Sequence, residues 1–247
     1  MRAMKTKILS RRLALSSAFS FFHSFTLSRF HALTFFCALT PAYAVSIVNS
    51  PHNLSVSGPG SIKSTTETQV CIFCHTPHNA DPTAPLWNRA AGSGANYTMP
   101  WSATLKAYPS AGAAPQPDGA SKLCLTCHDG TIALGSVRSR TSPISVSGGP
   151  TFVPGQKGYL GTDLSGSHPI SFVYSDGLAV SNNAAGNMPL RMPSTLNDPD
   201  VKLDSQGKIQ CTTCHDPHDD RNYGGAGVPH FYAKPTWSGT CLTCHDF

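Results

Sequence analysis

Apolar residues follow two different patterns along the chain. Up to residue 44 they form two nearly continuous runs, at residues 13–27 and 30–39. Beyond residue 44 they occur singly or in short groups among glycine, proline and serine, and no helical or strand period is sustained for long. A period of about 3.6 or 2 residues is the main sequence signal of an amphipathic helix or a half-buried strand. We therefore predict mainly irregular backbone, with short helical turns and few or no strands.

The two early runs belong to a segment typical of an export signal. Five basic residues and no acidic residue precede the first run, and the segment ends in Ala-Tyr-Ala at residues 42–44, a small-x-small cleavage site. Neither run reaches the roughly 18–20 apolar residues of a membrane-spanning helix. We predict that residues 1–44, including Cys37, are a signal peptide that is removed. The mature chain is then expected outside the cell or on its outer surface, or alternatively in the periplasm, with no membrane span.

Removal of this leader changes the charge balance. The whole chain has 18 Lys and Arg against 13 Asp and Glu. The leader contains 6 of the basic residues and none of the acidic ones, so 12 and 13 remain and the net charge is −1. No basic excess is left to favour nucleic acid as a partner. Only 13% of the residues are charged, about half the usual share of a globular protein and too few for a disordered chain. Something other than side-chain packing must hold the chain together.

Eight cysteines of the mature chain occur in four Cys-x-x-Cys pairs, each followed directly by a histidine. The four motifs are Cys71, Cys74 and His75; Cys124, Cys127 and His128; Cys211, Cys214 and His215; and Cys241, Cys244 and His245. Disulfides or four-cysteine zinc sites would explain the cysteines of an exported protein, but not a histidine after every pair. The motif is that of c-type haem attachment, in which two thiols bond to the haem and the histidine is the proximal iron ligand. We expect four covalently bound haem c groups.

Four haems also account for the weak apolar pattern. The mature chain has 203 residues, which is about 51 for each haem. A segment of that length can surround one haem macrocycle, which is large and apolar, but leaves few residues to build a core of packed side chains. Covalent attachment and iron ligation restrain the chain as disulfides do. The predicted fold is therefore a multihaem cytochrome c with the haem stack as its core, mainly coil, with short α-helical turns at the haem sites and little or no sheet.

The four sites repeat as two pairs. The first and third read Cys-x-x-Cys-His-x-Pro-His, and the second and fourth read Cys-Leu-Thr-Cys-His-Asp. The first cysteines are 53 residues apart in one pair and 30 in the other, and 87 residues rich in glycine, serine and proline separate Cys124 from Cys211. We predict a single tetrahaem domain, residues 45–247, built as two di-haem modules at about 45–140 and 195–247 with a loop-rich insertion between them.

Five histidines remain as candidates for the sixth position of each iron: His52, His78, His168, His218 and His230. His78 and His218 each follow a proximal histidine by three residues, about 4.5 Å along a helical turn and on a similar face. Neither can reach the opposite side of its own haem, so each is expected to ligate a neighbouring haem. The alternative ligands, which would raise the potential, are the methionines Met99, Met188 and Met192.

The motifs around these sites resemble the doubled Cys-x-x-Cys-His cytochromes of metal-reducing bacteria. The resemblance lies in the attachment segments at 71–79, 124–131 and 211–218 and in the shorter motifs at 52–55, 85–89, 97–99 and 167–172. Within this family, the chain is most similar to tetrahaem outer-surface cytochromes that polymerise into extracellular nanowires. The resemblance covers nearly the whole mature chain. It implies bis-histidine ligation throughout, with distal roles for His52, His78, His168 and His218 and with His230 as the spare.

We expect electron transfer and no catalysis. An enzyme that works at haem needs an open iron position, whereas here the candidate ligands outnumber the irons. The alternatives are a soluble periplasmic shuttle and a small multihaem reductase, which would require one haem without a distal histidine. The expected partners are other redox proteins or extracellular metal acceptors.

The ends of the mature chain suggest how copies could associate. The fourth motif ends at His245, two residues from the end of the sequence, and His52 lies eight residues beyond the predicted cleavage site. One subunit could therefore cap the next through His52, in a head-to-tail contact that generates a filament. Alternatively, His52 folds back onto a haem of its own chain.

Overall fold

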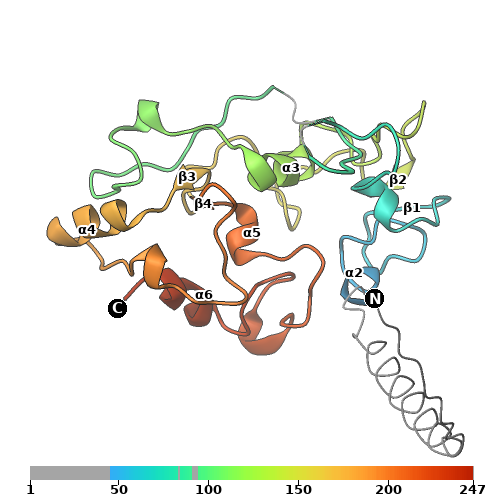
Figure 1. Cartoon of the computed structure of the whole chain (residues 1–247). Coiled ribbons are helices and arrows are strands. Elements are labelled where there is room, and N and C mark those ends of the chain that lie inside the picture. Colours follow the sequence, from blue (N-terminus) through green and yellow to red (C-terminus); the bar gives the residue numbers. More distant parts are fainter. Residues whose placement is uncertain (1–44, 83, 91–93, 247) are drawn as a thin grey trace, which may run out of the picture. The chain divides into compact units, whose positions relative to one another are not determined.

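The computed structural model describes residues 45–82, 84–90 and 94–246. The described residues belong to one compact unit. The predicted signal peptide lies outside the described residues. Figure 1 shows the described chain as short helices joined by long irregular segments.

The described part contains few regular elements, and all of them are short. The α-helices are α2 (Val45–Val48), α3 (Gly119–His128), α4 (Asp176–Ala184), α5 (Cys211–Cys214) and α6 (Trp237–Cys244). The strands are β1 (Lys63–Ser64), β2 (Val146–Ser147), β3 (Phe172–Val173) and β4 (Lys208–Ile209), and single 3₁₀ turns occur at Cys71–Phe73, Ala111–Ala113, Pro193–Thr195 and Gly225–Gly227. Most of the remaining described backbone forms turns, bends and coil. The prediction of mainly coil with little sheet is confirmed. Among the described residues, no helix is long and apolar enough to span a membrane.

Each Cys-x-x-Cys pair lies on a helical turn. The first pair is on the 3₁₀ turn Cys71–Phe73 and its cap Cys74, and the other three are on α3, α5 and α6. Residues i and i+3 lie on one face of such a turn, so the two thiols of each pair point to the same side. The helix α6 begins where the Thr236 hydroxyl accepts a hydrogen bond from the amide of Gly239, at 3.0 Å.

Two small antiparallel sheets connect the insertion to the attachment segments. The strand β2 of the insertion pairs with β1, which precedes the first site. The strand β3, also in the insertion, pairs with β4 directly before the third site, in the register Phe172 opposite Ile209. The insertion is therefore attached to both predicted modules.

Apolar packing among the described residues is limited to small clusters. Met99, Leu125 and Leu164 form one of them, and Tyr174, Ala179 and Ile209 form another. Several of the most buried side chains are polar or charged, among them Asn53, Asn88, Arg89 and Gln210. Hydrogen-bonded polar groups therefore position the attachment segments as much as apolar packing does.

Candidate functional site

All eight described cysteines are free thiols. Within the part of the chain that the structure describes, no group of three or more cysteine, histidine or carboxylate side chains is placed to hold a metal ion. The paired cysteines therefore assemble neither disulfides nor four-cysteine zinc sites there. They remain available, two by two, for a group that bonds to both thiols of a pair.

The four cysteine pairs adjoin one another in chain order. Cys127 of the second site lies close enough to Cys74 of the first to raise the pKa of Cys74. The Cys124 thiol of the second site hydrogen-bonds to Cys211 of the third. Cys214 in turn interacts electrostatically with the fourth site. A series of bound groups attached here would follow the same order.

Burial raises the pKa of most of these thiols. It raises the pKa of Cys74 to about 12 and that of Cys214 to about 11, with neighbouring thiols adding to the shift. The hydrogen bond from Cys124 instead lowers the pKa of Cys211 to about 7.

Three proximal histidines each lie beside a second histidine. The ring centres are 5.9 Å apart for His75 and His218, 6.0 Å for His128 and His52, and 6.4 Å for His245 and His168. Two imidazoles bound on opposite sides of one metal, each through a bond of about 2 Å, have ring centres roughly 6 Å apart. The three spacings therefore fit bis-histidine ligation of one iron per pair.

The pairing joins distant parts of the chain. His218 lies beside His75 of the first site and not beside His215, three residues before it. His52 lies beside His128 of its own chain, which is the fold-back alternative for this residue. His168 of the insertion lies beside His245.

Backbone carbonyls orient several of these rings. Nδ1 of His128 donates to the Gly158 carbonyl at 2.6 Å, and Nδ1 of His168 donates to the Pro169 carbonyl at 2.8 Å. Because a carbonyl only accepts, the proton is on Nδ1, and Nε2 keeps its lone pair for a metal. The ring of His52 likewise hydrogen-bonds to the backbone of Pro217.

Lowered pKa values favour the neutral form, which binds a metal, in four of the six paired imidazoles. Burial, reinforced by the neighbouring His128, lowers the pKa of His52 to about 4. Burial also lowers the pKa values of His75, His128 and His245.

The remaining three histidines beyond residue 44 are placed differently. His215 is exposed as a residue, but its ring hydrogen-bonds to the backbone of His230 and lies beside Tyr232, with ring centres 5.3 Å apart. Partial burial of the ring, together with the nearby His128, lowers the pKa of His215. His78 is also exposed, and the structure describes no hydrogen bond, ion pair or ring contact for its side chain. His230 hydrogen-bonds to Asp220 at 2.7 Å and stacks on Tyr223.

The alternative methionine ligands lie elsewhere. Met99 packs in the apolar cluster with Leu125 and Leu164. Met188 and Met192 are exposed. His75, His128 and His245 each have a second histidine beside them, so none of these three sites needs a methionine ligand.

Sequence reasoning did not identify the aromatic side chains around the histidines. Phe152 stacks on His128, Phe231 stacks on His52, and Trp87 stands edge-on to His75. Nε1 of Trp87 is buried and has no hydrogen-bond partner among the described residues. An acceptor on a bound cofactor, such as a haem propionate, would satisfy it. The residues present therefore fit a haem at the first site. Trp87 belongs to a motif noted in the sequence, whereas no sequence signal marks the two phenylalanines.

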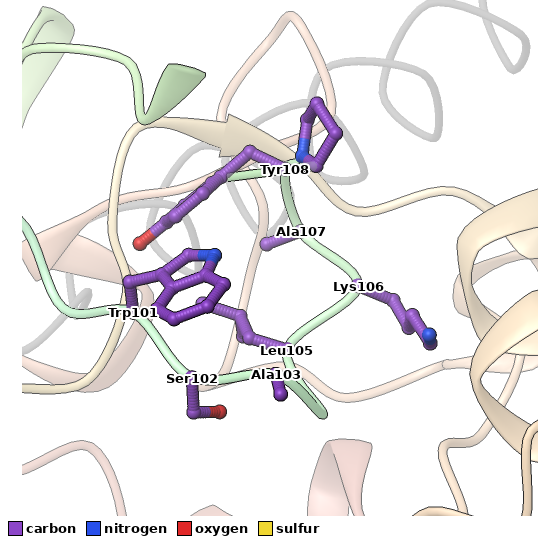
Figure 2. Close-up of a pocket in the computed structure, with 8 residues that line it drawn as sticks. Trp101, Ser102, Ala103, Leu105, Lys106, Ala107 and Tyr108 are labelled. Atoms are coloured by element: carbon purple, nitrogen blue, oxygen red, sulfur yellow. The ribbon is translucent and has the colours of Figure 1, made fainter. Parts of the chain in front are cut away.

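A small cavity of about 310 Å³ lies within the loop 101–109. Figure 2 shows Trp101 and Tyr108 lining it, with the Lys106 side chain pointing away from both. Its lining includes no histidine or cysteine, so it is not part of the candidate site.

The chain matches no model of a known protein family and no curated protein. The assignment of function therefore depends on the motifs and on the geometry described above.

Proposed function

We propose that the protein is a tetrahaem c-type cytochrome that transfers electrons through bis-histidine haems. The observation that carries this proposal is the set of three histidine pairs, with ring centres 5.9–6.4 Å apart, in which one member always follows a Cys-x-x-Cys pair. Neither a structural nor a zinc-binding role of the cysteines accounts for these pairs.

The cysteines would hold each haem through two covalent bonds, and the paired histidines would ligate its iron. The haem, when bound, supplies one-electron redox chemistry. The carbonyls of Gly158, Pro169 and Pro217 would orient the ligands, and burial would favour the neutral form of His128 and His52. Two histidines held at each iron in both oxidation states would allow electron transfer with little rearrangement of the chain. The adjoining attachment sites suit transfer in chain order.

The test is the haem content and spin state of the purified holoprotein. We expect four haems per chain, a low-spin spectrum, and a new high-spin haem in His168→Ala, because His245 loses its partner. A wild-type spectrum in which several of the four haems are high-spin would contradict bis-histidine ligation.

We further propose that His215 receives its distal ligand from His78 of another copy of the chain, so that copies join head to tail into a filament. Both residues are exposed, and neither makes a ring contact with another histidine among the described residues, although the ring of His215 hydrogen-bonds to the backbone of His230. The contact joins different surfaces of the two copies and need not close. His52, the ligand favoured from the sequence, lies beside His128 of the same chain and is not free for this role.

Electron microscopy of the secreted protein tests this assembly. The wild type is expected to form filaments whose reduced haems do not bind carbon monoxide. His78→Ala should remain monomeric, with one haem that is high-spin and binds carbon monoxide. His230→Ala is the matched control and should behave like the wild type. A monomeric wild type that binds carbon monoxide at one haem would instead support the reductase alternative, with the open position at His215.

A further inference from the structure

The ring of Phe231 lies flat against the imidazole of His52. The two ring centres are 4.2 Å apart and the planes differ by 23°. Phe231 is 6% exposed, so the contact is buried. The hydrogen bond from His52 to the Pro217 backbone restrains one edge of the imidazole, and the flat contact with Phe231 restrains its rotation about that bond.

The backbone holds Phe231 in place in an uncommon conformation. Its φ is +63°, in the left-handed region that bulky residues rarely adopt. Its amide donates to Oδ1 of Asp220 at 2.7 Å, and its carbonyl accepts from the amide of Asp216 at 2.8 Å. A conformation of this kind persists only where the surroundings determine it strongly. The position of the Phe231 ring is therefore well defined.

The three histidine pairs differ in the angle between their planes. This angle is 21° for His75 and His218, 58° for His128 and His52, and 81° for His245 and His168. In a ferric low-spin haem, the angle between the axial ligand planes sets the energy separation of two iron d orbitals. Near-parallel planes give a three-line rhombic resonance, and strongly crossed planes give one broad feature at large g. Unhindered ligands favour near-parallel planes.

We propose that Phe231 is a positioning residue that sets the plane of the His52 ligand and keeps the ligand planes at that haem crossed. This inference rests on the proposed bis-histidine function and adds a role for a residue that would not touch the iron. It implies that the chain contains two spectroscopic classes of haem, because the His75 and His218 pair is near-parallel.

Electron paramagnetic resonance of the oxidised holoprotein tests the proposal. We expect the wild type to show both classes of resonance. In Phe231→Leu, one haem's intensity should move from the large-g class toward the rhombic class, because His52 is free to rotate. Phe231→Tyr keeps the flat ring and should retain the wild-type spectrum. Phe172→Leu, which removes a partly buried ring of the cluster around Tyr174, is the matched control and should leave every resonance unchanged.

Phe231→Met provides a second variant if the leucine variant does not load haem, because it retains apolar volume without a flat ring. An unchanged spectrum in a loaded Phe231→Leu or Phe231→Met protein would overturn the proposal, as would an equal shift in Phe172→Leu. Failure of the proposed function is distinguishable, because the wild type would then lack low-spin ferric resonances altogether.

Discussion

The buried guanidinium group of Arg89 connects three segments of the chain by hydrogen bonds, where a larger protein would use apolar packing. The residue is fully buried, and its nitrogens donate to the hydroxyl and carbonyl of Thr126 and to the carbonyls of Ala133 and Leu134, at 2.7–3.2 Å. One side chain thus connects the segment after the first attachment site to the helix of the second and to the loop beyond it.

We predict that Arg89→Met destabilises the holoprotein by about 3 kcal/mol, because it leaves buried carbonyls without a donor. Arg140→Met is the control: this arginine pairs with Glu67 at 3.0 Å but is 43% exposed, so its loss should cost less than about 1 kcal/mol. Guanidinium chloride unfolding of both variants measures the difference. Equal midpoints would show that the Arg89 hydrogen bonds contribute nothing specific.

At the scale of elements, the second and third sites are held together by Gln210. Its amide oxygen accepts from the backbone and hydroxyl of Ser121 on α3, and its amide nitrogen donates to Asp118 and Asp204, both at 2.9 Å. The amide of Cys211, the next residue, donates to the same serine hydroxyl at 3.0 Å. These bonds determine how α3 and α5 pack, although 87 residues separate Cys124 from Cys211.

Gln210→Leu should therefore loosen the contact between α3 and α5. We expect a loss of about 2 kcal/mol in unfolding free energy, since the buried Ser121 hydroxyl and the Cys211 segment lose the amide that holds them. Gln156→Leu, which removes solvent-exposed hydrogen bonds, should change stability by less than about 1 kcal/mol. Thermal unfolding followed by absorbance of the haems is a suitable measurement. A stable Gln210→Leu protein would mean that the covalent groups alone hold the two helices.

The irregular backbone could be predicted because it depends on local sequence, and the candidate attachment motifs are local for the same reason. A Cys-x-x-Cys-His motif supplies two thiols and one imidazole within five consecutive residues. The absence of apolar periodicity can likewise be seen in the sequence without a structure. The partner of each proximal histidine could not be predicted. His52 and His128 are 76 residues apart in sequence, and His75 and His218 are 143 apart. Their pairing depends on contacts such as those of Phe231 and Gln210, which no local pattern marks.

At the scale of the whole mature chain, the insertion is part of the folded unit. It pairs through β2 and β3 with segments before the first and third sites, and Leu160 and Leu190 pair with the backbone of His128 and His245. The insertion also contains His168. The two predicted modules are therefore joined by contacts and not only by the chain between them.

The net charge of the whole molecule predicts which partners it attracts. Under the proposed function, four haems would add two propionates each to residues 45–247, whose net charge is −1, and would make the holoprotein strongly acidic. Cationic patches of redox proteins, cationic ferric complexes and positively charged mineral surfaces should then be favoured acceptors. We predict that the rate of reduction of a soluble cationic ferric complex falls as ionic strength rises, because screening weakens attraction. Stopped-flow kinetics at several salt concentrations measure this, and an anionic ferric complex should show the opposite trend.

The contact between Cys124 and Cys211 also constrains how the protein matures. With a pKa of about 7, Cys211 is partly thiolate at neutral pH, and the thiolate is the nucleophile that forms disulfides. In an oxidising compartment, a chain that folded before haem attachment would lose two electrons to a disulfide oxidant and close a Cys124–Cys211 bridge. That bridge would remove one attachment thiol from each of two sites. Under the proposed function, we therefore predict that haem loading precedes folding or is accompanied by a reductant, and that mass spectrometry of unloaded, oxidised protein finds this bridge ahead of any other.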